Sequence, residues 1–191
     1  MPITIGQRPD HGFDEPLGLL SDCHRRIQHF LHVLVAVDAE LAGGSLTAGH
    51  RSALDQSLQY FATSAPKHTD DEEESLFPRL RATGDPAAAE ALGLLEGLEA
   101  DHDEAESLHS AVDLLVRRWI ADDGLVAAEA AHLREHLARL QAIYRRHIAI
   151  EDQDLFPAAA RLLDASTIHE IGREMAARRK VASEAKGEPR R

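Results

Sequence analysis

The fold is indicated by one pattern that the chain contains twice, HTDDEEESLFP at residues 68–78 and HIAIEDQDLFP at residues 147–157. Both copies read His-x-x-x-Glu-acid-x-x-Leu-Phe-Pro. Two further histidines, His24 and His102, each precede one copy at nearly the same distance along the chain. The sequence therefore predicts the same helical hairpin twice, with a lone histidine on one helix and His-x-x-x-Glu on the next.

Helical periodicity extends far outward from the two motifs. Apolar residues recur at helical spacing in four long segments that end at glycine- or aspartate-rich breakers, and a shorter fifth segment follows. These predicted helices are 16–41, 47–81, 85–121, 125–163 and 165–179. Pro78 and Pro157 should kink their helices or end the regular part. Long helices with short connections predict an all-α, up-down-up-down antiparallel four-helix bundle over residues 14–180, with flexible segments at 1–13 and 181–191.

The composition agrees with a helical, soluble protein and excludes several functions. Of the 191 residues, 43% are hydrophobic and 28% charged, and the formal net charge is −12. Such an acidic chain lacks the basic face that nucleic acids or anionic membranes require, so we expect neither as a partner. The single cysteine, Cys23, excludes an internal disulfide and suits a reducing cytoplasm. We expect no signal peptide and no membrane span.

The spacing of histidine and glutamate suits metal binding. Residues four apart on a helix share one face, so an imidazole and a carboxylate so placed can converge on one ion or on two adjacent ions. Antiparallel packing should bring His24, His68, His102 and His147 to one level of the bundle. Imidazole with carboxylate favours iron, manganese or zinc, and bundles commonly hold di-iron or di-manganese centres in this way.

The order His, His-x-x-x-Glu, His, His-x-x-x-Glu, with Leu-Phe-Pro after each second motif, resembles the hemerythrin family, also called the HHE cation-binding domain. The resemblance extends from about Leu17 to Leu163. It implies two non-haem iron ions, with Glu72 and Glu151 as the bridging pair. The ligand set that it implies is His24, His68, Glu72, His102, His147 and Glu151.

The chain departs from the oxygen-carrying hemerythrins at two positions. Those proteins place two histidines four apart on the third helix, whereas here the residue four after His102 is Glu106, which we predict to be a further ligand. Their last carboxylate is an aspartate five residues after the final histidine, a position that Asp152 holds here. We favour Glu151 over Asp152, because Asp152 would need a local widening of the helix to face the metal.

The remaining histidines are assigned lesser roles. His109 shares the inward face of His102 and is expected in the core or in contact with a ligand. The pair His132 and His136 is interpreted as helix surface or as filler packed within the bundle. No role is assigned to four others, His11, His29, His32 and His50.

Other polar residues near the motifs are expected to be structural. The acidic run at residues 70–74 should be mostly a solvated face that contains one ligand. Cys23 is interpreted as a small buried residue. Tyr60 and Tyr144 could approach the site or simply pack in the core.

These features predict a cytoplasmic di-iron protein that reacts with oxygen or peroxide, in a catalase-like, peroxidase-like or sensing role. An apolar stripe should restrict access to small molecules; it consists of Leu31, Phe61, Leu98 and Ile143. A carboxylate-rich ligand set stabilises ferric iron, which disfavours reversible oxygen carriage. The alternatives are iron or nitric-oxide handling, including repair of iron centres, and a non-enzymatic oxygen-binding or sensor bundle. Partners would be a diatomic ligand or peroxide, and the protein would be a monomer or weak homo-oligomer.

Overall fold

The computed structural model describes residues 10–185 and is all-helical over that range. The first long rod is α1 (Pro16–Leu41). The second consists of α2 (Ala48–Thr63), α3 (Ala65–Asp71), a π-helical turn η1 (Glu72–Leu76) and α4 (Phe77–Ala82). The third is α5 (Ala89–Asp122), preceded by a 3₁₀ turn η2 (Pro86–Ala88). The fourth consists of α6 (Ala127–Ile150), the π-helical turn η3 (Glu151–Leu155) and α7 (Phe156–Leu162), and α8 (Ala165–Ala185) follows.

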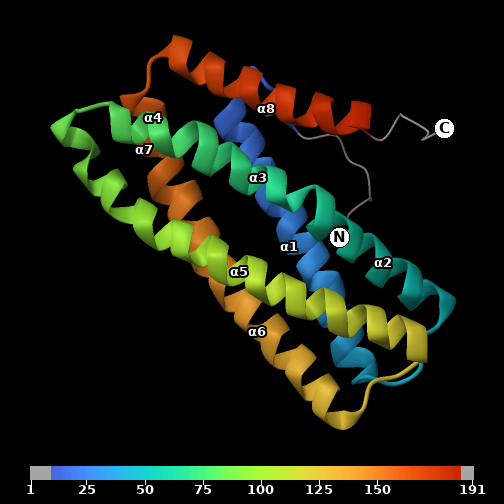
Figure 1. Cartoon of the computed structure of the whole chain (residues 1–191). Coiled ribbons are helices and arrows are strands. Elements are labelled where there is room, and N and C mark those ends of the chain that lie inside the picture. The colour runs from blue at the N-terminus through green and yellow to red at the C-terminus, as the bar shows by residue number, and fades with distance from the viewer. Residues whose placement is uncertain (1–9, 186–191) are drawn as a thin grey trace.

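The four rods lie side by side, and α8 crosses one end of them (Figure 1). The main helix contacts join α1 to α2 and α6, and α5 to α6 and α2. The predicted all-helical bundle is therefore confirmed. Within residues 10–185, no helix combines the length and the apolarity that crossing a membrane requires.

The second and fourth rods are not the single continuous helices that the periodicity predicted. Each contains a π-helical turn that begins at the motif glutamate, Glu72 or Glu151. The backbone N–H of Phe77 donates to the carbonyl of Glu72, and that of Phe156 to the carbonyl of Glu151. Proline follows each phenylalanine and has no N–H to donate, so a widened turn accommodates it without a break. The second rod is also interrupted at Ser64, between α2 and α3.

Two apolar clusters fill the bundle, one toward each end. The first includes Ile27, Leu34, Leu54, Trp119 and Leu140, and the second includes Leu20, Leu76, Phe77, Leu98 and Leu155, all of them buried. The buried motif histidines and glutamates belong to neither cluster. Most of the other buried polar side chains lie in the motifs or close to the lone histidines in sequence. They are Asp22, Asp71, Ser75 and Asp101.

The two turns at the lower end of Figure 1 fix the rods against each other. Gly43, with φ +80°, follows α1, and its carbonyl accepts a hydrogen bond from the Leu125 N–H at 2.9 Å. The indole Nε1–H of the fully buried Trp119 donates to the carbonyl of Gly44 at 2.7 Å. The α1–α2 turn is thus bonded to α5 and to the turn that follows it, which sets the axial level at which the histidines meet.

At the two ends of the described chain, the last helix is longer than predicted and His11 contacts the first helix. Helix α8 continues to Ala185, past the predicted end at residue 179. The backbone N–H of His11 donates to Asp22 at 2.9 Å. The flexibility of residues 1–13 and 181–191 stays a prediction, and residues 1–9 and 186–191 lie outside the described residues.

Candidate metal centre

The four motif side chains and the two lone histidines converge between the rods in two overlapping groups of four. We call His24, His68, Glu72 and Glu151 the first tetrad, and Glu72, His102, His147 and Glu151 the second tetrad. Within each tetrad, one ligand atom from every residue lies within 4.8 Å of the others. Glu72 and Glu151 belong to both groups, so the arrangement has two histidines on each side of a shared glutamate pair.

Each shared glutamate has one oxygen close to a histidine of the first tetrad and the other oxygen close to a histidine of the second. Glu72 Oε1 lies 3.4 Å from His68 Nε2, while its Oε2 lies 3.4 Å from His102 Nε2. Glu151 Oε2 lies 3.1 Å from His24 Nε2, while its Oε1 lies 3.1 Å from His147 Nε2. Carboxylates with this division of oxygens are placed to bridge two ions.

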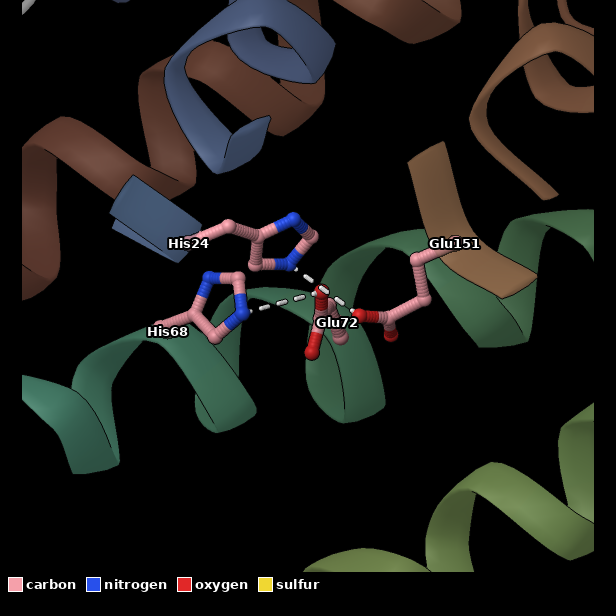
Figure 2. Close-up of side chains that lie close together, drawn as sticks. All are labelled: His24, His68, Glu72 and Glu151. Carbon is pink, nitrogen blue, oxygen red and sulfur yellow. Dashed lines mark ion pairs between the residues drawn. The ribbon is translucent and has the colours of Figure 1, made fainter. Parts of the chain in front are cut away.

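The first tetrad draws its residues from four separate elements. Figure 2 shows His24 from α1 and His68 from α3 side by side, with their ring nitrogens turned toward Glu72 and Glu151. The two imidazole rings meet edge to face, with centroids 4.8 Å apart. In the second tetrad the Nε2 atoms of His102 and His147 approach to 3.1 Å. Nitrogens held this close suit ligation of a common ion.

The polar atoms of this cluster are buried and largely without hydrogen-bond donors. Both glutamates are fully buried, and none of their four carboxylate oxygens has a hydrogen-bond partner among the described residues. His24 Nε2 is likewise buried and without a hydrogen bond in that part of the chain. Buried carboxylates are normally paired or bound to a metal, because removing their charge from water is costly. Four imidazoles and two carboxylates without thiolate fit two ions such as iron, manganese or zinc.

The acidic residue that follows each motif glutamate orients a histidine from another rod. His24 Nδ1 lies 3.0 Å from Asp152 Oδ1, and His102 Nδ1 lies 2.7 Å from Glu73 Oε1. A carboxylate that accepts the Nδ1 proton leaves Nε2 with its lone pair toward the tetrad, the usual outer contact of a ligating histidine. Ser21 donates to Asp152 at 2.7 Å and holds that carboxylate in place.

The phenylalanine of each Leu-Phe-Pro sequence packs against the lone histidine of the opposite half of the chain. The Phe156 ring stacks on His24, with planes 13° apart and centroids 5.5 Å apart. The Phe77 ring is nearly parallel to His102, with centroids 6.3 Å apart. The shared positions of the repeated motif therefore have structural roles. The histidine and the glutamate belong to the tetrads, and the following acid and the phenylalanine position the lone histidine of the opposite half. The proline accompanies the widened turn.

The ionisation of the cluster reflects its burial and its close packing. Burial and the neighbouring Glu151 carboxylate raise the pKa of Glu72 well above its ordinary value. Burial acts to raise the pKa of Glu151 as well, but His147 and His24 outweigh it and the pKa is lowered. Burial acts to lower the pKa of His24, yet Asp152 and Glu151 raise it to about 9. Burial and the nearby His24 lower the pKa of His68. Two adjacent carboxylates repel, and a bound cation would relieve that repulsion.

A cavity of about 620 Å³ leads to the cluster, and its lining includes all four tetrad histidines. Two further polar side chains of the lining are bonded to each other, His109 Nε2 lying 2.9 Å from the Tyr144 hydroxyl. The His109 ring stacks on Phe61 with centroids 4.1 Å apart, and burial lowers its pKa to about 4. Burial also raises the pKa of Tyr144, so both groups stay neutral near pH 7.

The remaining candidates lie outside the tetrads. Glu106 is exposed and lines the cavity near His102, so its role as a ligand stays a prediction. Asp152 contacts His24 and not the shared glutamates. We expected no local widening of the helix at this point, and that expectation was wrong, because a widened turn begins at Glu151. Of the apolar stripe, only Phe61 lines the cavity, since Leu31, Leu98 and Ile143 are packed in the core instead.

Sequence reasoning missed the outer residues Glu73 and Asp101. Glu73 belongs to the acidic run that we expected to be solvated. The repeat could have indicated its role, because Glu73 and Asp152 occupy the same position of the two motifs. Asp101 is buried, bonds to Arg146, and places Oδ2 3.4 Å from His147 Nδ1. Asp101 directly precedes His102, whereas Cys23 directly precedes His24, so the repeat could not point to Asp101.

The fold and the paired tetrads define a helical bundle whose histidine and glutamate groups could hold metal ions. The family model of the hemerythrin HHE cation binding domain matches residues 15–159, and the chain belongs to this family. A Haemophilus influenzae protein described as uncharacterized is 29% identical over 170 residues, which are 88% of this chain and 92% of that protein. That similarity covers most of the chain and assigns no activity.

Proposed function

We propose that this chain is an up-down-up-down four-helix bundle that holds two non-haem iron ions and reacts with oxygen or peroxide. His24 and His68 would hold one ion, His102 and His147 the other, and Glu72 and Glu151 would bridge them. The observation that carries the proposal is the division of the four glutamate oxygens between the two histidine pairs. Manganese or zinc suits the same ligands, and metal analysis decides between them.

The chain's own residues prepare the centre for a small reactant. Two iron ions bound here would supply the electrons that reduce oxygen or peroxide. Asp152 and Glu73 hold the Nδ1 protons of His24 and His102, which fixes the tautomer that ligation requires. The apolar clusters on both sides exclude bulk water, so that electrostatic interactions inside are strong.

The cavity gives small molecules a route, and its wall offers a proton donor. His109 and Tyr144 form a neutral hydrogen-bonded pair in that wall. A phenol or imidazole N–H in such a position can donate a hydrogen bond to a small oxygen-containing reactant. Phe61, stacked on His109, narrows the space around the pair and favours diatomic molecules or peroxide over larger substrates. The cytoplasmic location is part of the proposal and rests on the single buried cysteine.

Metal analysis of the purified protein, with an optical spectrum after air oxidation, tests the proposal. We expect two irons per chain, oxo-bridged ferric charge-transfer bands and oxygen evolution from added peroxide. The variant His147→Ala should lose metal, while His132→Ala, at an exposed position of the same helix, should keep it. Equal metal content in the two variants would contradict the ligand assignment. A stable oxygen adduct without peroxide consumption would contradict the proposed reactivity and leave the metal assignment standing.

A further inference from the structure

Helix α8 lies beyond the residues that match the family and packs against only part of the metal centre. The family match ends at residue 159, and α8 begins at Ala165. Its main contacts are with α1, α3 and η1, and Figure 1 shows it alongside α3 and across α1. These elements carry His24, His68 and Glu72. The helices α5 and α6, which carry His102 and His147, are not among its main partners.

The strongest contact of α8 is with the residue directly before the bridging Glu72. Asp71 is fully buried, and two consecutive arginines of α8 each bind one of its oxygens. Arg178 Nη1 donates to Oδ1 at 2.7 Å, and Arg179 Nη2 donates to Oδ2 at 2.7 Å. A buried carboxylate bound by two guanidinium groups is held rigidly, because any movement would break charge-assisted hydrogen bonds.

A second set of contacts holds the far end of the same widened turn. Ser75, also fully buried, donates to Glu174 Oε2 at 2.6 Å and accepts from Arg178 Nη2 at 2.7 Å. Arg79 in α4 completes the set through its 2.8 Å contact with Glu174 Oε1. Polar side chains of α8 therefore bind side chains on both sides of Glu72, at positions 71 and 75.

The second half of the chain lacks these anchors, although its motif is otherwise the same. When the two motifs are aligned, Asp71 corresponds to Ile150, Ser75 to Asp154 and Arg79 to Ala158. The buried acid that binds two arginines is thus replaced by an apolar side chain. The duplicated halves differ at the positions that receive α8, so this helix docks on the first half through specific residues and not through features common to both.

We propose that α8 is a clamp that holds the ion of the first tetrad, with Asp71, Arg178 and Arg179 as positioning residues. Both histidines of that tetrad lie on elements that α8 contacts, and Glu72 follows Asp71 directly. Loosening α8 frees α3 and η1 to shift, which moves His68 and Glu72 away from His24. The second tetrad keeps His102, His147 and Glu151 on elements that α8 does not hold. The two ions therefore differ in how strongly they are retained, and α8 sets the difference. This inference rests on the two-ion centre proposed above.

The experiment compares the full chain with the double variant Arg178→Ala/Arg179→Ala, using Arg173→Ala as the matched control. Arg173 lies on the same helix, is exposed and pairs with Glu170 of α8 itself. Each protein is loaded anaerobically with Fe(II), and the iron remaining per chain is followed over time in a ferrous chelator. Removing the outer contacts of a metal ligand weakens binding by about 10- to 100-fold. We expect the double variant to release one ion that much faster and to pause at one ion per chain.

A comparison with His68→Ala identifies the ion that is released. In a His68→Ala protein, which lacks the first-tetrad histidine of α3, the double variant should speed release of the remaining ion far less than it speeds release of the first ion from the otherwise wild-type chain. The remaining ion keeps His102, His147 and Glu151 on elements outside the main contacts of α8. If the double variant does not fold, Glu174→Gln, which leaves the Asp71 contacts intact, should give the same one-ion pause with a smaller change in rate.

Several results would overturn the clamp. Parallel release of both ions, or release at the wild-type rate from the double variant or Glu174→Gln, would mean that α8 stabilises the bundle in general or not at all. In either case the two-ion centre stands. A wild-type protein that binds no more than one ion would overturn both the clamp and the proposed function.

Discussion

The replacement of Glu72 by glutamine should have opposite effects on the metal-bound and metal-free protein. The amide keeps the shape of the side chain but removes the charge that both tetrads share. Both ions lose a bridging ligand, so their binding weakens. The metal-free fold gains, because burial and Glu151 raise the pKa of Glu72 and its charge is costly there.

The size of the effect follows from mass action at two sites. An ion present at about 100 times its dissociation constant stabilises the fold by about 2.7 kcal/mol, so two ions contribute about 5 kcal/mol. For a chain of this length, each kcal/mol shifts the melting temperature by about 2–4 °C. Chelation should therefore lower the melting temperature of the wild-type protein by about 10–20 °C. In Glu72→Gln the drop should be less than about half of that.

Thermal unfolding followed by circular dichroism, with and without chelator, measures both effects. Glu90→Gln is the matched control, because Glu90 is exposed and lies outside the tetrads. Metal-free Glu72→Gln should melt at or above the temperature of the metal-free wild type. If the chelator does not change the wild-type melting temperature, or lowers that of Glu72→Gln by as much as that of the wild type, the two ions do not share Glu72 as proposed.

Three further predictions concern protonation, the cavity wall and the third helix. In the metal-free protein, the pKa of His24 is raised to about 9, so protonated His24 stabilises the fold fully below pH 6.5 and this contribution is lost as the pH rises through 9. Urea unfolding should show the free energy of unfolding falling across this window by up to about 1.4 kcal/mol per pH unit. A flat profile would count against the His24–Asp152 contact. Tyr144→Phe leaves His109 without its hydrogen-bond partner, so it should lower the free energy of unfolding by about 1–3 kcal/mol and slow peroxide consumption. Tyr60→Phe is the control, because it removes a hydroxyl with no hydrogen bond among the described residues. It should change the free energy of unfolding by less than about 0.5 kcal/mol. Glu106→Ala should lower iron toward one per chain if the predicted ligation holds, and unchanged iron content would remove Glu106 from the ligand set.

The fold class and the six tetrad residues could be predicted from the sequence because their pattern is local and repeated. His-x-x-x-Glu needs only helical spacing to bring its two side chains to one face, and the second copy excludes coincidence. The lone histidines, His24 and His102, could be added because the repeat assigns them the same place in each half.

The partners of those residues were decided by tertiary packing. Asp152 accepts from His24, and Glu73 from His102, although both pairs are far apart along the chain. Such contacts depend on the rotation of each helix about its axis and on its axial level. Two apolar clusters and the bonded turns at Gly43 and Gly44 fix both quantities, and no local periodicity reports them.

The widened turns and the docking of α8 show the same division between local and long-range causes. Pro78 and Pro157 indicated a disturbance of their helices, but a kink and a π-helical turn are alternatives that only the surrounding packing selects. Asp71 is one acid in a run that we expected to be solvated, and only the approach of Arg178 and Arg179 from α8 made it a buried anchor. The sequence determined which side chains face the centre of the bundle, since helical geometry is set by neighbours in the chain. The tertiary structure decided what holds them there, since those contacts come from residues far away in the chain.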